Sequence, residues 1–274
     1  IIADKNDLGD KITTHKGISK ISFTGSTATG SRVLASAAST LKRVTLELGG
    51  NDAGIVMDDV DVEAVAPQIF DGAFGNNGQI CIAMKRVYAH ESIYDKLVDQ
   101  LAELAKEAAV GNGLEQGTKL GPLQNKMQFD KVKGYIEEGR ADGTIVAGGE
   151  VPDGKGYFIP PTIVKDIDDE SRLVKEEQFG PVLPVIKYDD IDDVIERAND
   201  TDYGLGGSVW SSDTDRAYEV AKKVDSGTIW VNKHADVQPH IPFGGIKTSG
   251  IGAELGEEGL AEFTARKVIN VAKA

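Results

Sequence analysis

The 274-residue sequence contains a single cysteine, Cys81. One cysteine excludes a disulfide within the chain and is typical of proteins kept in a reducing compartment, so the sequence predicts a cytoplasmic location. No apolar run approaches the roughly 20 residues of a membrane-spanning helix. The first residues, Ile1–Asp7, also lack the apolar stretch of a signal peptide. We therefore expect no membrane partner.

Positive charge and metal-binding clusters are scarce as well. The chain has 30 Lys and Arg against 44 Asp and Glu, a formal net charge of −14 and a pI of about 4.8. A chain this acidic repels phosphate backbones, which argues against a nucleic-acid partner. The four histidines are scattered and no Cys/His cluster exists, so we predict no metal site. Asp166–Glu170 superficially resembles a calcium loop, but Ser171 stands where that loop needs glycine.

The apolar pattern alternates between strands and helices, without repeats or low-complexity stretches. Ile18–Phe23 is predicted as a strand, Thr24–Thr27 as a turn, Ala28–Ser39 as a helix and Val44–Leu48 as a second strand. Such a βαβ unit requires a parallel connection. The alternation continues to a last strand at Thr228–Asn232. We therefore expect an α/β protein with a parallel-rich sheet.

Two helix starts are predicted from capping residues. Asp61 precedes a run of apolar residues at helical spacing and can cap it. Ser92 and Asp95 form a capping-box pattern before the next such run, which predicts a helix beginning at that point.

Cys81 follows a segment that favours an irregular loop. Gly75, Asn76, Asn77 and Gly78 precede it within Phe74–Cys81. A polar loop gives a thiol the access that a nucleophile needs. The alternative is that Cys81 is a small buried hydrophobe, and the residues by themselves leave both interpretations open.

Glu47 lies 34 residues upstream, at the end of a predicted strand and just before Gly49 and Gly50. The carboxyl end of a parallel strand is where α/β proteins bind ligands. Partial burial would raise the pKa of such a carboxylate toward neutrality and suit it to act as a general base. The alternative is a solvated residue on a sheet edge.

Three further segments have both a functional and an ordinary interpretation. The turn at Thr24–Thr27 opens a helix whose amides can bind a pyrophosphate, yet many helices begin in this way. Glu176–Pro181 joins carboxylates to an aromatic and a rigid turn, or forms a solvated acidic face. Pro242–Gly250 is rich in glycine and lets backbone pass close to a ligand, or simply crosses between domains.

Taken in order, these motifs resemble those of the NAD(P)-dependent aldehyde dehydrogenase family over nearly the whole chain. The motifs are Phe23–Thr27, Leu46–Gly50, Gly78–Cys81, Glu176–Pro181 and Pro242–Gly245, followed by Glu254–Leu260. The resemblance implies that Cys81 is the nucleophile and Glu47 the general base. The thiolate would attack an aldehyde, and the thiohemiacetal would give hydride to the nicotinamide. Water activated by Glu47 would then hydrolyse the thioester.

The resemblance also assigns the surrounding residues. The cofactor, NAD or NADP, would lie near Thr24, Gly25, Ser26, Leu48, Glu177 and Phe179. The substrate pocket would include Ile80, Ile82 and Phe243, with Lys233–Ile241 as a substrate-selecting loop. Having Glu47 favours hydrolysis of the thioester over its transfer to coenzyme A.

Members of this family are about twice as long, so the chain is expected to begin partway through the cofactor domain with an incomplete cofactor site. We expect a remnant of the dinucleotide-binding domain at 1–49, a catalytic domain at 50–248 and a return to the cofactor domain at 249–274. A strand around Lys267–Val271 would join a sheet between subunits of a homo-oligomer.

Two alternatives accompany this interpretation. The chain is either a non-catalytic fragment that folds or assembles with other subunits, or a small thiol esterase that uses Cys81 and Glu47 without a nicotinamide.

Overall fold

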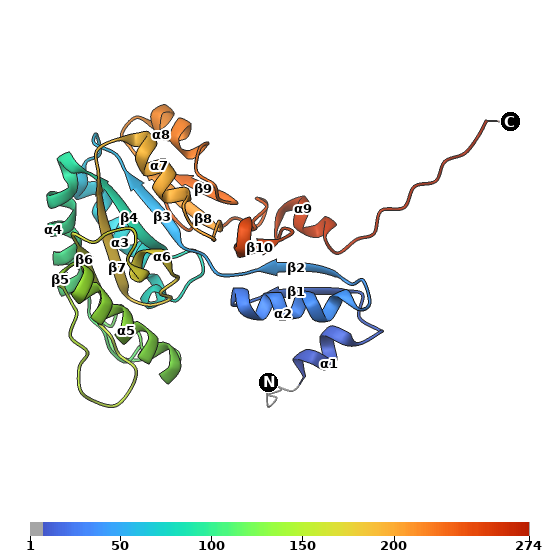
Figure 1. Cartoon of the computed structure of the whole chain (residues 1–274), viewed down its shortest axis with the longest axis horizontal. Helices are drawn as coiled ribbons and strands as arrows, with labels where there is room; N and C mark the ends of the chain where they lie inside the picture. Colours follow the sequence, from blue (N-terminus) through green and yellow to red (C-terminus); the bar gives the residue numbers. More distant parts are fainter. Residues whose placement is uncertain (1–7, 274) are drawn as a thin grey trace.

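Two sheets of unequal size form the centre of the computed structural model, which describes residues 8–273 (Figure 1). The large sheet has seven strands in the order β5-β6-β7-β4-β3-β8-β9, and the small sheet has three in the order β1-β2-β10. Neighbouring strands of the large sheet are parallel except β5 and β6. The α/β class with a parallel-rich sheet is thereby confirmed. The signal-peptide prediction for Ile1–Asp7 lies outside the described residues.

The strands of the large sheet are short, and most of them alternate with helices in the sequence. They are β3 (Asp52–Val56), β4 (Met84–His90), β5 (Thr144–Ala147), β6 (Thr162–Lys165), β7 (Val182–Tyr188), β8 (Gly206–Trp210) and β9 (Thr228–Val231). Its helices are α3 (Val62–Phe74), α4 (Glu91–Glu107), α5 (Lys126–Asp142), α6 (Arg172–Lys175), α7 (Ile191–Asn199) and α8 (Thr214–Ala221), with a 3-10 turn η1 (Gly75–Gly78) after α3.

The small sheet contains the predicted βαβ unit. β1 (Lys20–Thr24) and β2 (Arg43–Glu47) pair in parallel and are joined by α2 (Thr27–Ala38). Ser26 caps α2 by accepting a hydrogen bond from the amide of Thr29. The remaining elements of this part are α1 (Gly9–Thr14), η2 (Lys247–Ser249), β10 (Gly250–Ile251) and α9 (Gly256–Ala261). The late strand β10 returns to pair antiparallel with β2.

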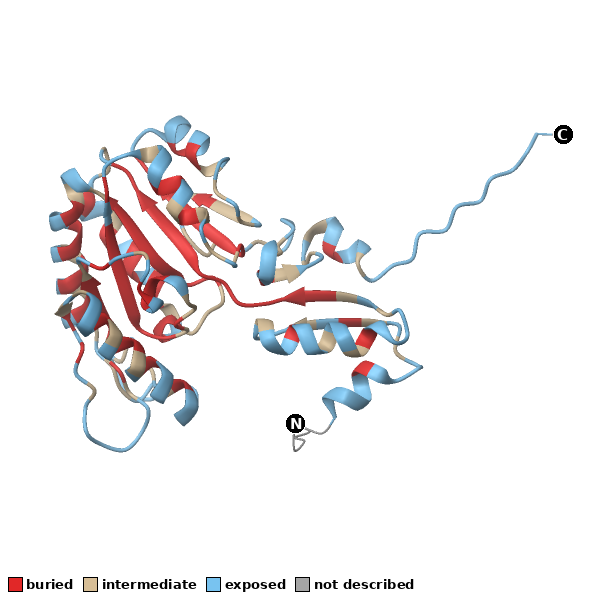
Figure 2. Cartoon of the chain, viewed as in Figure 1, coloured by how far each residue is buried: buried red, intermediate tan, exposed pale blue. Residues whose placement is uncertain are grey.

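The core is double-sided because helices cover both faces of the large sheet. Residues of α3 and α4 pack in one apolar cluster, and residues of α5, α7 and α8 pack in another. Successive residues of β4 alternate between them, since Val87 and Ala89 face the first cluster and Tyr88 the second. The central strands β3, β4, β7 and β8 are therefore buried along almost their whole length, as parallel strands covered on both faces must be, whereas the edge strands β5 and β9 are only partly buried (Figure 2).

One of the two capping predictions is correct and the other is wrong. Asp61 caps α3 by accepting a hydrogen bond from the amide of Glu63. The helix α4 does not begin at Ser92: it begins at Glu91, and His90 is its cap through Nδ1, which accepts from the amide of Ser92 at 3.3 Å. β4 passes directly into α4, so the last residue of the strand is already the cap.

The chain crosses between the sheets immediately after β2. Ser249 fastens this crossing: its hydroxyl donates to the carbonyl of Gly49 at 2.6 Å and accepts from the amide of Gly204 at 2.9 Å. The carbonyl of Ser249 also accepts from the amide of Leu48 at 2.9 Å. As a result, the carboxyl end of β2 meets the amino ends of β3 and β4 (Figure 1).

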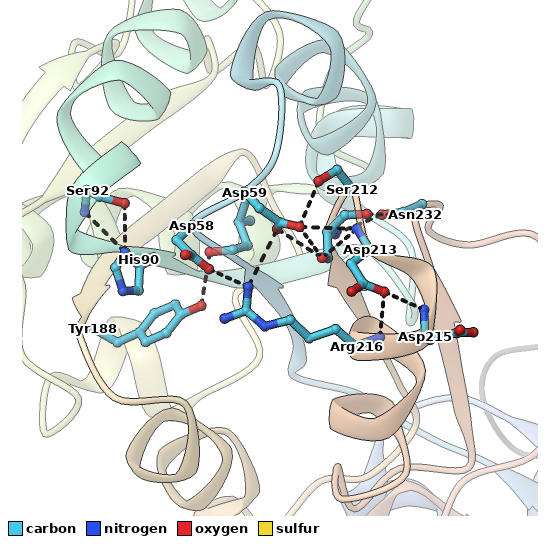
Figure 3. Close-up of polar contacts among 12 residues, drawn as sticks. Asp58, Asp59, His90, Ser92, Tyr188, Ser212, Asp213, Asp215, Arg216 and Asn232 are labelled. Atoms are coloured by element: carbon cyan, nitrogen blue, oxygen red, sulfur yellow. Dashed lines mark hydrogen bonds and ion pairs between the residues drawn. The ribbon is translucent and has the colours of Figure 1, made fainter.

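At the opposite, carboxyl edge of the large sheet, polar side chains from neighbouring strand ends hydrogen-bond to one another and to the backbone (Figure 3). We refer to this network as the closure of the edge. The carboxylate of Asp59, just after β3, accepts from the hydroxyls of Ser211 and Ser212 and from the amide of Asp213. Asn232, just after β9, exchanges two hydrogen bonds of 2.9 Å with the backbone of Ser211. Asp59 therefore joins the end of β3 to the turn between β8 and α8.

Replacing Asp59 tests this closure. Asp59→Ala leaves two hydroxyls and an amide without their charged acceptor, so we expect the free energy of unfolding to fall by about 1–3 kcal/mol. The matched control is Asp58→Ala, which breaks an exposed ion pair of 2.7 Å with Arg216 and should cost less than about 1 kcal/mol. Urea unfolding at pH 7 measures both.

The same variant predicts a pH dependence. Burial acts to raise the pKa of Asp59, but hydrogen bonds from Ser212, Ser211 and the Asp213 amide outweigh it and lower that pKa. A depressed folded-state pKa stabilises the fold above the unfolded pKa of about 3.9 and loses that contribution as pH falls. The difference between wild type and Asp59→Ala should therefore shrink below about pH 4. A difference that stays constant at low pH would contradict this.

Candidate active site

A left-handed turn delivers Cys81 to the start of β4. Asn76, Asn77 and Gly78 have φ angles of 51°, 59° and 72°. Asparagine and glycine tolerate this region of backbone space best. At Gly78 a side chain would also collide, because a Cβ would lie 2.5 Å from the carbonyl oxygen of Gly180. The predicted irregular loop is thus present, and Cys81 on it is partly exposed.

Glu47 is the last residue of β2 and is 4% exposed. Burial raises its pKa to about 7, the Cys81 thiol opposes that rise, and the carboxylates of Glu254, Glu177 and Asp52 add to it. Its Oε1 atom is buried and has no hydrogen-bond partner among the described residues. The unpartnered oxygen can accept a hydrogen bond from a water molecule, which is what a general base requires.

The thiol of Cys81 and the carboxyl of Glu47 lie close enough for each to shift the pKa of the other. Burial raises the pKa of Cys81 to about 12, the charge of Glu47 raises it further, and the charge of Lys85 lowers it. The cysteine is therefore a protonated thiol at neutral pH in this state of the chain. A neighbouring carboxylate is the group that can take its proton.

Two glycines allow other groups to approach this pair. A Cβ on Gly49 would lie 2.5 Å from Oε2 of Glu177, and a Cβ on Gly50 would lie 2.7 Å from the carbonyl oxygen of Cys81. The amide of Gly50 donates to Oε1 of Glu177 at 3.2 Å. Glu47, Cys81 and Glu177, which are far apart in sequence, therefore meet at the glycine pair.

Helix α5 holds the segment that carries Glu177 and Phe179. Nε2 of Gln128 donates to the carbonyls of Gln178 and Phe179 at 2.8 and 2.9 Å. Nζ of Lys131 donates to the carbonyl of Glu177 at 2.9 Å. The side chains of Glu177 and Phe179 remain partly exposed next to the crossing between the sheets.

The other predicted cofactor residues lie on the small sheet. Thr24 is paired in register with Glu47, and the amide of Gly25 donates to the carbonyl of Glu47 at 3.1 Å. Ser26 follows as the cap of α2, and Thr24 and Ser26 are exposed. Leu48 is 5% exposed. The predicted set is thus gathered at the carboxyl edge of the small sheet, where α/β proteins bind ligands.

The predicted substrate residues gather in a separate apolar cluster around the thiol. Ile82 is buried with Leu205 and Trp230, and Ile80, Cys81, Ala235 and Phe243 pack against them. A cavity of about 310 Å³ adjoins this cluster between β9 and the loop at 233–241, and Trp230, Lys233 and Phe243 are among its lining residues. The structure thus places Ile80, Ile82 and Phe243 beside Cys81.

Sequence reasoning missed three buried ionisable groups under the Cys81 loop: Asp52, Lys85 and His234. Burial raises the pKa of Asp52 to about 7 and lowers that of His234 to about 4. A lysine at the start of an apolar strand was the available signal for Lys85. His234 had none, because its importance comes from a contact with residues about 150 positions away.

Among residues 8–273, no three or more His, Cys, Asp or Glu side chains are grouped so that they could hold a metal ion. Within the same range, no helix combines the length and the apolar composition needed to cross a membrane.

Comparison with known proteins identifies relatives along the whole chain. The model of the aldehyde dehydrogenase family matches residues 1–269. The mitochondrial aldehyde dehydrogenase of Leishmania tarentolae is 45% identical over 96% of this chain and 53% of its own length. The chloroplastic betaine aldehyde dehydrogenase of Beta vulgaris is 44% identical over 94% of this chain and 52% of its own. The chain thus spans about half the length of these relatives.

Solved structures are equally similar. An aldehyde dehydrogenase of Bacillus cereus superposes with a TM-score of 0.91 at 42% identity, covering 94% of this chain and 52% of that one. An aldehyde dehydrogenase of Mycobacterium tuberculosis complexed with NAD+ gives 0.90 at 40% identity, covering 93% and 53%. With a family model matching nearly every residue and the fold shared at this level, the chain belongs to the aldehyde dehydrogenase family.

Proposed function

We propose that the protein of which this chain is part oxidises an aldehyde to a carboxylic acid with NAD or NADP. Cys81 is the nucleophile and Glu47 the general base. The observation that carries this proposal is the buried Glu47 carboxyl, whose pKa is raised to about 7 beside the only thiol of the chain. A base with a pKa near neutrality is half ionised at pH 7 and can both accept and release a proton.

In this mechanism the chain's own groups act in turn. Glu47 takes the proton of the Cys81 thiol, and the sulfur forms a bond to the aldehyde carbon in the apolar cluster around Trp230. Hydride loss leaves a thioester on Cys81. Glu47 passes the first proton to solvent and is ionised again. Its unpartnered oxygen then holds a water and removes a proton from it as the water attacks the thioester, and this proton returns to the sulfur as the acid and the thiol are released.

The residues at the carboxyl edge of the small sheet suit the nicotinamide end of a dinucleotide. Glu177 offers a carboxylate that can accept ribose hydroxyls, Leu48 an apolar surface, and Thr24, Gly25 and Ser26 a turn at the start of a helix. The bound dinucleotide would supply the hydride acceptor. Related enzymes of Staphylococcus aureus and Mycobacterium tuberculosis have been solved in complex with NAD+, which supports this choice.

The proposed location is the cytoplasm, on the basis of the single unpaired cysteine. The proposed domain division follows the two sheets, with boundaries near residues 49 and 249, where the chain crosses between them.

Two activity measurements separate this proposal from the alternatives. Aldehyde-dependent NADH formation that disappears in Cys81→Ser supports the oxidoreductase. Ester hydrolysis that depends on Cys81, with no NADH formed at any NAD concentration, supports the thiol esterase. Neither activity, in a chain that is folded by circular dichroism, supports a non-catalytic fragment.

We also propose that the carboxyl-terminal tail joins copies of the chain. Residues 264–273 form neither helix nor strand, and the tail extends away from both sheets (Figure 2). Val268, Ile269 and Val271 are 76–80% exposed, an apolar segment that a strand partner would cover.

The tail proposal predicts the effect of a charge. Ile269→Asp should weaken assembly, because a desolvated carboxylate is costly at a paired strand. The dissociation constant measured by sedimentation velocity should rise at least tenfold. Lys267→Gln is the control and should assemble as wild type does. A wild-type chain that stays monomeric at high concentration would contradict the proposal.

Trapping the acyl intermediate tests the two catalytic assignments. With p-nitrophenyl acetate, wild type should release p-nitrophenol and turn over. Glu47→Gln should acylate more slowly, since it lacks the base that takes the thiol proton, and should then accumulate acetyl-Cys81 because hydrolysis slows about 10²–10⁴-fold. Mass spectrometry of the labelled peptide reports the site, and Cys81→Ser should give none. Glu150→Gln, at a carboxylate that is 91% exposed, is the matched control. Equal acyl lifetimes in Glu47→Gln and wild type would remove Glu47 from the mechanism.

The raised pKa of Glu47 predicts the pH profile of deacylation. The base works only when ionised, so the rate of thioester hydrolysis should rise with pH up to about 7 and level off above it. A single-turnover hydrolysis series from pH 5 to pH 9 measures this. A rate that is already flat from about pH 5 upward, as for a carboxyl with an ordinary pKa, would show that Glu47 is not buried in solution.

A further inference from the structure

Every backbone carbonyl from residue 80 to residue 83 is held by a buried basic side chain. Nζ of Lys85 donates to the carbonyls of Ile80, Cys81 and Ala83 at 3.1, 2.7 and 3.1 Å. The remaining carbonyl, that of Ile82, lies 2.8 Å from Nε2 of His234. The two side chains come from the first residues of β4 and from the loop after β9, and together they hold the peptide units on both sides of the reactive sulfur.

The hydrogen-bond pattern around His234 sets which ring nitrogen carries the proton. Nε1 of Trp210 donates to the hydroxyl of Ser208 at 2.9 Å, so that hydroxyl is free to donate its own proton. Nδ1 of His234 lies 3.0 Å from the Ser208 hydroxyl oxygen and accepts the hydrogen bond that this hydroxyl donates. Nε2 then carries the proton and donates to the carbonyl of Ile82. Burial lowers the pKa of His234 to about 4, so the ring is neutral and this arrangement persists at neutral pH.

Lys85 has no donor left for a ligand. An ammonium group has three N–H donors, and all three are used by the carbonyls of the loop. The residue is 3% exposed, and the buried carboxylate of Asp52 provides an opposite charge. Lys85 therefore acts on the backbone of the loop and not on substrate.

We propose that Lys85 and His234 are positioning residues that fix the Cys81 loop, and with it the direction of the thiol and of the Cys81 amide. The inference rests on the proposed role of Cys81 as nucleophile. The left-handed turn at 76–78 precedes the loop, and β4 begins only at Met84, so the sheet ladder does not hold residues 80–83. Without the two side chains these peptide units would have only the bond from the amide of Ala83 to the carbonyl of Ile80.

The proposal has an electrostatic consequence. The charged groups that shift the pKa of the Cys81 thiol are Glu47 at the end of β2, Asp52 in β3 and Lys85 in β4. Of these, only Lys85 favours the thiolate. Removing its charge should raise the pKa of Cys81 and lower the fraction of reactive thiolate at a given pH.

Local amide hydrogen exchange on the full chain tests the positioning role. Lys85→Met and His234→Phe should each raise exchange in the peptide covering residues 79–84 about tenfold or more, while exchange in α4 and β7 stays unchanged. The conservative variants Lys85→Arg and His234→Gln keep a donor and should stay within about threefold of wild type. Lys155→Met, at an exposed loop lysine, is the control. The proposal is overturned if the exchange rate of residues 79–84 in both Lys85→Met and His234→Phe equals that of wild type. It is also overturned if the exchange rate rises equally over the whole chain.

The rate of alkylation by iodoacetamide gives a second readout that a purely structural lysine would not move. Between pH 7 and pH 9 Lys85→Met should react about tenfold more slowly than wild type, as for one unit of pKa, and Lys85→Arg should recover most of the rate. If Lys85→Met does not fold, the His234 pair decides the proposal by exchange. If Cys81 is alkylated in wild type and at the same rate in Lys85→Met, the proposed charge effect of Lys85 is wrong. If Cys81 is not alkylated even in wild type, the result counts against the proposed function instead.

Discussion

The structure depends on a crossing between two sheets that has no room for a side chain. At Gly49 and Gly50 the backbone leaves β2 and enters β3, and Cβ atoms there would lie only 2.5 Å from Oε2 of Glu177 and 2.7 Å from the carbonyl oxygen of Cys81. Ser249 fastens the crossing from the other side. Because three distant segments meet at this backbone, the carboxyl of Glu47, the thiol of Cys81 and the carboxylate of Glu177 lie close together. A larger residue at either glycine would separate them.

Buried charge explains the chemistry that this volume can support. Water is largely excluded, so the free energy of ionisation rises for each acid, and the pKa values of Glu47 and Asp52 reach about 7. Lys85 is the counter-charge, but its donors are spent on backbone carbonyls. The site thus combines acids whose pKa values are near neutrality with a loop held by hydrogen bonds from two side chains.

At the opposite, carboxyl edge of the large sheet, Asp59 and its partners satisfy one another's hydrogen bonds (Figure 3).

Much of the fold was predictable because its signals are local. The βαβ unit, the cap at Asp61 and the loop before Cys81 each follow from a few neighbouring residues. The start of α4 was not predictable in this way. Ser92 and Asp95 form a capping-box pattern, but His90, the last residue of β4, is the residue that caps the helix. β6 was missed altogether, in a stretch where two prolines interrupt the pattern. The roles of Lys85 and His234 were not predictable, since their partners are set by packing.

The sequence by itself determined the family, through the order of its motifs, and with it the candidate residues Cys81 and Glu47. Motif order survives in one dimension because each motif is a short run with its own backbone requirement. Only the tertiary structure decided that Glu47 is buried, that one of its oxygens has no partner, and that two basic side chains hold the carbonyls around the thiol. Burial and hydrogen bonding between distant segments are properties of the packed chain, so no local pattern records them.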